Sequence, residues 1–290
     1  MQYDASRKAL YHPELQPPLP KQFFAGKPEA LCAELARLAY FRFEQDASEL
    51  RQALEAHGLG RVQCFVNTQV GTQAFAALDQ AGTAYVAFRG TQPHSLKDLV
   101  TDLKAVPVAW IDGTQVHSGF ARAYDPPPAL VGAADVNPRT AIAAWLDASG
   151  CRRLVCTGHS LGAALATLLA ADRAEAELVS VGSPRVGDAA FARLFDGRAV
   201  SRYVDCTDGV TLLPPPVIFE HVGESAYIDR RGMLHPDGMD SAALLADHLA
   251  AHVAYLVRYT TRFWRNVLLR SLADHAPINY VSALLGIREP

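Results

Sequence analysis

The residue with the clearest potential for chemistry is a serine flanked by glycines. Ser160 stands at the centre of residues 158–162, which read Gly-His-Ser-Leu-Gly. The strand-like stretch 154–157 precedes this pattern, and a run of small residues that begins at Leu161 follows it. A strand, a sharp turn and a helix in this order present a nucleophilic serine above a sheet. We expect Ser160 to be a nucleophile, with the Leu161 N–H facing the developing oxyanion. The alternative is a tight or phosphate-binding turn.

A nucleophilic serine needs a base to take its proton and an acid to orient that base. In α/β hydrolases these groups follow one another in the order serine, acid, histidine. Asp208 follows the predicted strand 200–204, and Asp205 is its nearest rival. His248 and His275, each at the end of a Leu-Ala-Asp-His sequence, are the candidates for the base.

The two candidate histidines differ in their predicted local structure. Residues 244–257 around His248 have the pattern of one continuous helix, whereas Pro277 keeps the backbone near His275 extended or turning. A catalytic base normally projects from a loop, which favours His275. His248 and His252 lie four residues apart and could bind a metal ion. No nearby carboxylate pattern completes such a site, and we expect neither a metal nor a cofactor.

The elements that must position these residues alternate along the middle of the chain. Apolar runs of strand length are separated by stretches of helical periodicity, which is typical of βαβ units and a mainly parallel sheet with helices on both faces. Strands are predicted at 62–66, 74–78, 83–88, 153–157, 178–182, 200–204 and 226–229, and helices at 29–40, 48–57, 139–148, 161–173, 188–195, 240–260 and 278–285. The pattern predicts the α/β class.

The length of 290 residues suits one large α/β domain or two small ones. No internal repeat, low-complexity tract or linker divides the chain, and we expect 1–290 to form one domain. Residues 1–28 are rich in proline and have little periodicity. They are predicted to form an extended arm lying on that domain.

Composition excludes several classes of partner. The chain has 27 basic and 30 acidic residues, a formal net charge of −3, whereas nucleic-acid binding needs a basic face. No run reaches the roughly 18 apolar residues of a membrane span, and the longest candidate, 244–257, is interrupted by polar residues. Five cysteines without a CxxC pair predict free thiols in a reducing compartment. Since no signal peptide is visible, we expect a cytoplasmic protein.

Further motifs stand on both sides of the serine. They are Val-Ala-Phe-Arg-Gly-Thr at 86–91, Val-His-Ser-Gly-Phe at 116–120, Thr-Gly-His-Ser-Leu-Gly at 157–162 and Gly-Ser-Pro-Arg-Val-Gly-Asp at 182–188. In this order they resemble the class 3 lipase family, the fungal-lipase-like α/β hydrolases. The joint resemblance covers roughly residues 30–285 and is far more specific than the central serine pattern alone. It implies an α/β-hydrolase fold with helices on both faces of a mostly parallel sheet.

The resemblance also implies roles for individual residues. Thr91 occupies the position whose backbone N–H contributes to the family's oxyanion hole, beside the residue that follows the serine. Asp208 falls where the family has its triad acid, which favours it over Asp205. The family's histidine commonly stands in an Asp-His pair, with an aromatic residue a few positions later and a terminal helix behind it. His275 matches this pattern better than His248.

The segment 92–104 has the pattern of an amphipathic helix. Apolar residues recur at helical spacing, namely Leu96, Leu99, Val100 and Leu103. In the lipases that this chain resembles, the same stretch is a lid over the active site. Such a lid would expose its apolar face to lipid when open, whereas a fixed surface helix would explain the same leucines.

These features together predict a serine hydrolase that cleaves carboxylic esters through an acyl-enzyme, as a triacylglycerol lipase or a carboxylesterase. A phospholipase A1 or another acyl hydrolase would use the same triad of Ser160, Asp208 and His275. A lipase-like protein that binds lipid or protein without catalysis is a further alternative. The chain departs from the family at 230–272, a longer helical stretch than expected between acid and base.

Overall fold

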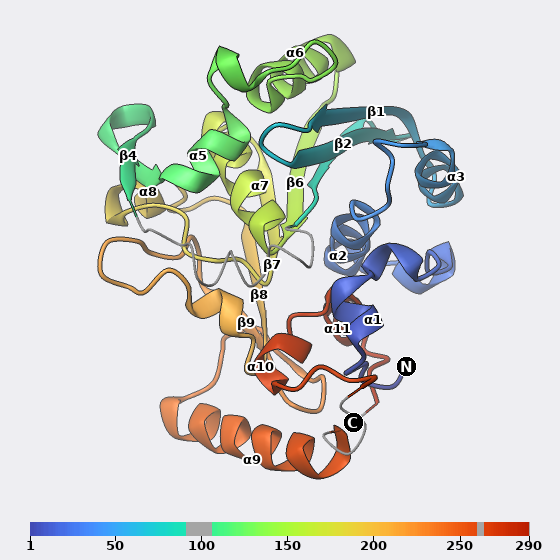
Figure 1. The fold of residues 1–290 in the computed structure, drawn as a ribbon, viewed down its shortest axis with the longest axis vertical. Coiled ribbons are helices and arrows are strands. Elements are labelled where there is room, and N and C mark those ends of the chain that lie inside the picture. The colour runs from blue at the N-terminus through green and yellow to red at the C-terminus, as the bar shows by residue number, and fades with distance from the viewer. Residues whose placement is uncertain (91–105, 260–263, 290) are drawn as a thin grey trace.

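A central sheet organises the molecule in the computed structural model, which describes residues 1–90, 106–259 and 264–289 (Figure 1). Within these residues the sheet has eight strands in the spatial order β1-β2-β3-β6-β7-β8-β9-β10. Their bounds are β1 (Leu59–Asn67), β2 (Thr72–Asp79), β3 (Thr83–Phe88), β6 (Arg153–His159), β7 (Glu177–Val181), β8 (Val200–Asp205), β9 (Ser225–Ile228) and β10 (Leu234–His235). The neighbours from β3 to β9 pair in parallel, and the pairs at both edges are antiparallel. The predicted mostly parallel sheet is confirmed.

The central strands divide their side chains between two apolar cores. In β3, Tyr85 contributes to one core and Val86 to the other, because successive side chains of a strand point to opposite faces. Helices cover both faces (Figure 1). One core includes residues of α2 (Pro28–Leu38) and α11 (Pro277–Leu284), and the other includes residues of α5 (Ser118–Tyr124), α6 (Pro138–Ser149), α7 (Leu161–Asp172) and α8 (Ala189–Arg193). Burial on both faces explains why β6 reads as a continuous apolar run.

The periphery carries the shorter elements and one long helix. Among the described residues these are α1 (Arg7–Tyr11), α3 (Ser48–Ala56), α9 (Ser241–Tyr259), α10 (Arg270–Ala273) and a two-stranded sheet of β4 (Pro107–Ala109) and β5 (Gln115–His117). The N-terminal stretch differs from the expected extended arm, since the Ser6 side chain accepts the Ala9 N–H and caps α1. Tyr3 and Leu10 enter the same core as α2 and α11. That 1–290 acts as one domain stays a prediction.

Three further expectations concern a membrane-crossing helix, the lid and the second oxyanion residue. No described helix is both long enough and apolar enough to cross a membrane. The lid predicted at 92–104 and the oxyanion residue Thr91 lie outside the described residues.

Candidate active site

Ser160 forms the turn between β6 and α7 in a backbone conformation that side-chain-bearing residues rarely adopt. Its φ is 59° and its ψ is −131°, and its N–H donates to the Val181 carbonyl oxygen at 3.0 Å. Such a conformation costs on the order of 1–3 kcal/mol and persists only where the surrounding structure enforces it. The predicted strand, sharp turn and helix are therefore present, with the serine at the turn.

Glycines permit this turn because the backbones of β3 and β6 both approach the start of α7 closely. A Cβ on Gly158 would lie 2.2 Å from the Gly162 carbonyl oxygen, and a Cβ on Gly162 would lie 2.2 Å from the Phe88 carbonyl oxygen. A Cβ on Gly90 would lie 3.1 Å from the Ser160 Cβ. Only glycine leaves room for backbone at these distances.

The hydroxyl group of Ser160 is buried and has no hydrogen-bond partner among the described residues. Leu161 is the first residue of α7, and the N–H groups of a first helical turn have no acceptor within the helix. The positive end of the helix dipole therefore begins beside the serine, where negative charge on a reacting carbonyl oxygen would be stabilised. Thr91, the predicted second donor, lies outside the described residues, and its role stays a prediction.

Asp208 and His275 form a buried pair. His275 Nδ1 lies 2.7 Å from Asp208 Oδ2, and both side chains are almost inaccessible to solvent. Asp208 Oδ1 accepts the Val210 N–H at 2.9 Å, which caps the 3-10 helix Gly209–Leu212. The carboxylate is thus fixed on both oxygens, and it favours the tautomer with the proton on Nδ1. His275 Nε2 is buried without a partner among the described residues and is available as a base.

Contacts through β7 bring this pair next to the serine. Ser160 donates to the carbonyl oxygen of Val181, and the following residue is Gly182. A Cβ on Gly182 would lie 3.0 Å from Asp208 Oδ2 and 3.2 Å from His275 Nδ1. The structure thus gathers all three predicted residues at one place: Ser160 directly follows β6, Asp208 lies shortly after β8, and His275 lies shortly after α10. This is the grouping of nucleophile, base and acid that acyl transfer needs.

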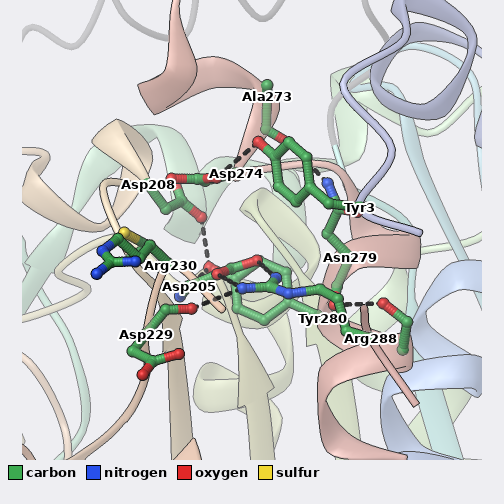
Figure 2. Close-up of polar contacts among 12 residues, drawn as sticks. Tyr3, Asp205, Asp208, Asp229, Arg230, Ala273, Asp274, Asn279, Tyr280 and Arg288 are labelled. Atoms are coloured by element: carbon green, nitrogen blue, oxygen red, sulfur yellow. Dashed lines mark hydrogen bonds and ion pairs between the residues drawn. The ribbon is translucent and has the colours of Figure 1, made fainter. Parts of the chain in front are cut away.

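Tyr280 supplies a second donor to the carboxylate of Asp208. Its hydroxyl donates to Asp208 Oδ2 at 2.5 Å and accepts the Asp205 N–H at 3.0 Å (Figure 2). Burial and then the Asp208 charge raise the pKa of Tyr280 well above its ordinary value, so the hydroxyl stays protonated. The sequence assigned no role to Tyr280, although Tyr280 is the aromatic residue that the family pattern places shortly after the histidine.

His159 supports the loop that carries the candidate base. The ring centroids of His159 and His275 lie 4.4 Å apart. His159 Nε2 lies 2.8 Å from the His275 carbonyl oxygen, and Nδ1 lies 2.8 Å from the Tyr40 hydroxyl. Burial and then the neighbouring His275 lower the pKa of His159 well below its ordinary value. The ring is therefore neutral, donates from Nε2 to the carbonyl and accepts a hydrogen bond from the Tyr40 hydroxyl at Nδ1. The sequence interpretation missed this role, although His159 stands inside the serine pattern.

Asp274 joins the loop of the candidate base to the loop of the candidate acid. Its Oδ2 accepts the Thr207 N–H at 3.0 Å and the Thr207 hydroxyl at 2.8 Å, and its Oδ1 accepts the Tyr3 hydroxyl at 2.7 Å. Thr207 immediately precedes Asp208, and Asp274 immediately precedes His275. The Asp274 carboxylate therefore fixes the position of the His275 loop relative to the Asp208 loop. The Asp-His pair in the sequence was the available signal for this residue.

The rival candidates occupy other environments. Both carboxylate oxygens of Asp205 bind Arg288, at 2.5 and 3.0 Å. His248 lies on α9, with its ring centroid 6.0 Å from that of Tyr227, and its buried Nε2 has no hydrogen-bond partner among the described residues. His252, four residues further, is exposed. In the described parts of the chain no group of three or more His, Cys, Asp or Glu residues is placed to hold a metal ion.

Known proteins resemble this chain in sequence and in fold. The family described as lipase (class 3) matches residues 85–218. A lipase of Rhizomucor miehei is 34% identical over 164 residues, which cover 52% of this chain and 43% of that protein. Secreted mono- and diacylglycerol lipase 1 of Fusarium solani is 30% identical over 195 residues, which cover 64% of this chain and 56% of that protein. The solved structure of the R. miehei triacylglyceride lipase matches with a TM-score of 0.60 at 24% identity, over 88% of this chain and 93% of that one.

The comparisons confirm the predicted resemblance to the class 3 lipase family and the predicted fold, and they overturn the predicted location. The chain spans about half the length of the curated relatives it matches, and the α/β-hydrolase fold is confirmed by the structural match. The predicted cytoplasmic location is wrong, because the relatives from F. solani and Gibberella zeae are named as secreted lipases. The expectation rested on the cysteine pattern and on the lack of a visible signal peptide, and neither feature decides where a protein is located.

Proposed function

Because the chain belongs to the class 3 lipase family, we propose that it is a serine hydrolase that cleaves carboxylic esters of lipids. The observation that carries this proposal is the buried Asp208–His275 pair beside the unpartnered hydroxyl of Ser160. The fold supplies the strained turn, the helix terminus and the polar pair that such a reaction uses. The substrate we propose is an acylglycerol or a simple carboxylic ester, since the relatives are named as lipases.

The proposed reaction has two acyl-transfer steps. His275 Nε2 takes the hydroxyl proton as Ser160 Oγ attacks the ester carbonyl carbon, and Asp208 stabilises the resulting imidazolium. The Leu161 N–H stabilises the oxyanion, with Thr91 as the proposed second donor. Collapse of the intermediate breaks the carbon–oxygen ester bond, and the imidazolium gives its proton to the departing alcohol. Water then attacks the acyl-enzyme with His275 as base, which releases the carboxylic acid and restores Ser160.

A Ser160→Ala substitution tests the nucleophile. We expect hydrolysis of a soluble nitrophenyl ester to fall by at least about 10⁴-fold, because loss of the nucleophile removes the covalent pathway. A fluorophosphonate should label the unaltered chain at Ser160 and leave the variant unlabelled. Circular dichroism and thermal unfolding of both proteins establish that the variant is folded. Unchanged turnover in a folded variant would sink the proposal.

A paired comparison tests the base, since two histidines follow the same Leu-Ala-Asp-His sequence. His275→Ala should abolish turnover of the soluble ester, because Asp208 then has no imidazole to orient. His248→Ala should retain turnover, because that side chain lies on α9 against Tyr227. Loss of activity in the second variant alone would assign the base to His248.

A substrate panel separates the finer alternatives. Triacylglycerols, diacylglycerols, phosphatidylcholine and short nitrophenyl esters offer the same carbonyl group with different leaving groups and head groups. Preference for the sn-1 ester of a phospholipid would make the protein a phospholipase A1. A lid at 92–104 stays a proposal, and a rise in rate above the solubility limit of a short triacylglycerol would support it.

A further inference from the structure

A small cavity beside α9 is lined by arginines from three separate elements. Arg230 and Arg231 stand in the turn between β9 and β10, Arg258 stands near the end of α9, and Arg270 begins α10. Helices α9 and α10 pack against each other (Figure 1). None of the described residues that line the cavity is acidic. The fold therefore brings four guanidinium groups, from segments about 40 residues apart at most, to one hollow.

Arg270 is buried and has a donor without an acceptor. Its side chain is 6% exposed, and its guanidinium carbon lies 5.0 Å from the ring centroid of Tyr3. Its Nε pairs with Asp274 at 3.1 Å, and its Nη1 donates to the Ala251 carbonyl oxygen at 3.3 Å. Its Nη2 is buried and has no hydrogen-bond partner among the described residues. Because buried charged groups normally have their donors satisfied, this atom indicates that an acceptor binds here.

The charges around the cavity leave an excess of positive charge. Within the described parts of the chain, two carboxylates pair with these arginines: Asp274 with Arg270 at 3.1 Å, and Asp247 Oδ1 with Arg230 Nε at 3.2 Å. Four guanidinium groups and two carboxylates thus leave two positive charges uncompensated. A phosphate group carries close to two negative charges at neutral pH. Its charge matches the excess better than that of a single carboxylate.

We propose that this cavity binds a phosphate group, either as the free ion or as part of a small phosphate monoester. Guanidinium groups bind phosphate oxygens through pairs of parallel hydrogen bonds, and Arg270 Nη2 and Arg231 supply donors. The volume of about 210 Å³ is several times the roughly 30 Å³ share of one water molecule in the liquid. The proposal does not depend on ester hydrolysis, since no lining residue belongs to the proposed triad.

Isothermal titration calorimetry of the full chain with inorganic phosphate tests the proposal, with sodium chloride added to keep the ionic strength constant. Binding should saturate at one ion per chain. Arg270→Lys keeps a charge opposite Asp274 but lacks the planar fork, and it should raise Kd by at least about fivefold. Arg231→Gln should raise Kd by a similar factor, about fivefold. Arg122→Gln is the matched control, because Arg122 is an exposed arginine of α5 outside the cavity, and its Kd should stay within about twofold of the parent.

Further titrations separate the possible ligands. Glycerol 3-phosphate that binds as tightly as inorganic phosphate would assign the cavity to phosphate monoesters, whereas binding of inorganic phosphate alone would assign it to the free ion. Acetate that binds as tightly as phosphate would overturn the proposed ligand class. Absence of saturable phosphate binding, or variants that bind as well as Arg122→Gln, would overturn the site. Thermal unfolding checks that each variant is folded, and if Arg270→Lys is not, the exposed Arg231→Gln decides alone.

Discussion

At the scale of single residues, the carboxylate of Asp208 is held by three donors. Its Oδ2 meets His275 Nδ1 and the Tyr280 hydroxyl, and its Oδ1 accepts the Val210 N–H. A hydrogen bond to a charged group contributes about 1.5–3 kcal/mol, more than one between neutral groups. The donors together hold the Asp208 carboxylate in one orientation, and Asp208 in turn orients the imidazole.

Tyr280→Phe should lower kcat on a soluble nitrophenyl ester by about 10–100-fold with little change in KM. The substitution removes one charge-assisted hydrogen bond from Asp208 and leaves the Asp205 N–H without its acceptor, a loss of about 1.5–3 kcal/mol if it is fully expressed in the transition state. KM should stay nearly unchanged, because the lost hydrogen bond is on the side of the imidazole that faces away from the substrate. Steady-state kinetics with a folded variant check this prediction.

Tyr124→Phe is the matched control for that experiment. Tyr124 is also fully buried, and its hydroxyl also donates to a carboxylate, Asp172 Oδ2, at 3.1 Å. Asp172 stands at the end of α7 that is opposite the serine turn. The control should lose stability and keep kcat. Equal losses of kcat in the two variants would mean that Tyr280 acts only through the general stability of the fold.

At the scale of elements, the serine turn depends on how closely β3 approaches the first residues of α7. Gly162 allows this approach, Gly158 allows β6 to turn sharply into α7, and Ser160 has a positive φ at that turn. The strained turn places the hydroxyl at the end of the sheet and the first helical N–H beside it. The packing of strand against helix is thus what places the serine hydroxyl and the helical N–H where they can react with a substrate.

Gly162→Ala should destabilise the protein by at least about 2 kcal/mol, because the added methyl group would overlap the Phe88 carbonyl and force the helix away from the strand. Ester hydrolysis should fall with it, since the serine turn moves. Gly60→Ala in β1 is the control, because nothing lies within 4 Å of a Cβ at that position. Chemical denaturation measures the free energy of unfolding, and two variants of equal stability would contradict the prediction.

At the scale of the whole molecule, segments from both ends of the chain contact the residues that support the site. Tyr3 donates to Asp274, and Arg288 binds both Asp205 and the Asp229 carbonyl oxygen (Figure 2). Asp205 is the last residue of β8, three positions before Asp208. The terminal segments therefore support the two loops that carry the acid and the base.

Arg288→Met should reduce the free energy of unfolding by about 3–5 kcal/mol, since it leaves the buried carboxylate of Asp205 without its partner. Adding Asp205→Asn to Arg288→Met should recover much of that loss, because the uncompensated charge is then gone. Arg153→Met breaks the exposed pair with Glu177 and should cost no more than about 1 kcal/mol. Urea denaturation of the four proteins checks the order, and a single variant as stable as the double variant would contradict it.

Local sequence patterns determined the nucleophile and the class of fold. The glycines around Ser160, the apolar run before it and the small residues after it are neighbours in the chain, so strand, turn and helix could be predicted without knowing any distant contact. The alternation of apolar runs and helical periodicity predicted the mostly parallel sheet for the same reason. The N-terminal arm was the local exception, because the cap at Ser6 and the burial of Tyr3 depend on its packing.

The sequence by itself therefore determined Ser160 and narrowed the acid and the base to short sets of candidates. Only the tertiary structure decided which aspartate meets which histidine, since Asp208 and His275 are joined by the order of strands and by the Asp274 contact between their loops. It also revealed the contacts of Tyr280 and His159, which no local pattern could predict because their partners lie far away in the chain. The physical reason is that burial and hydrogen bonding between distant segments are properties of packing, which periodicity along one segment does not record.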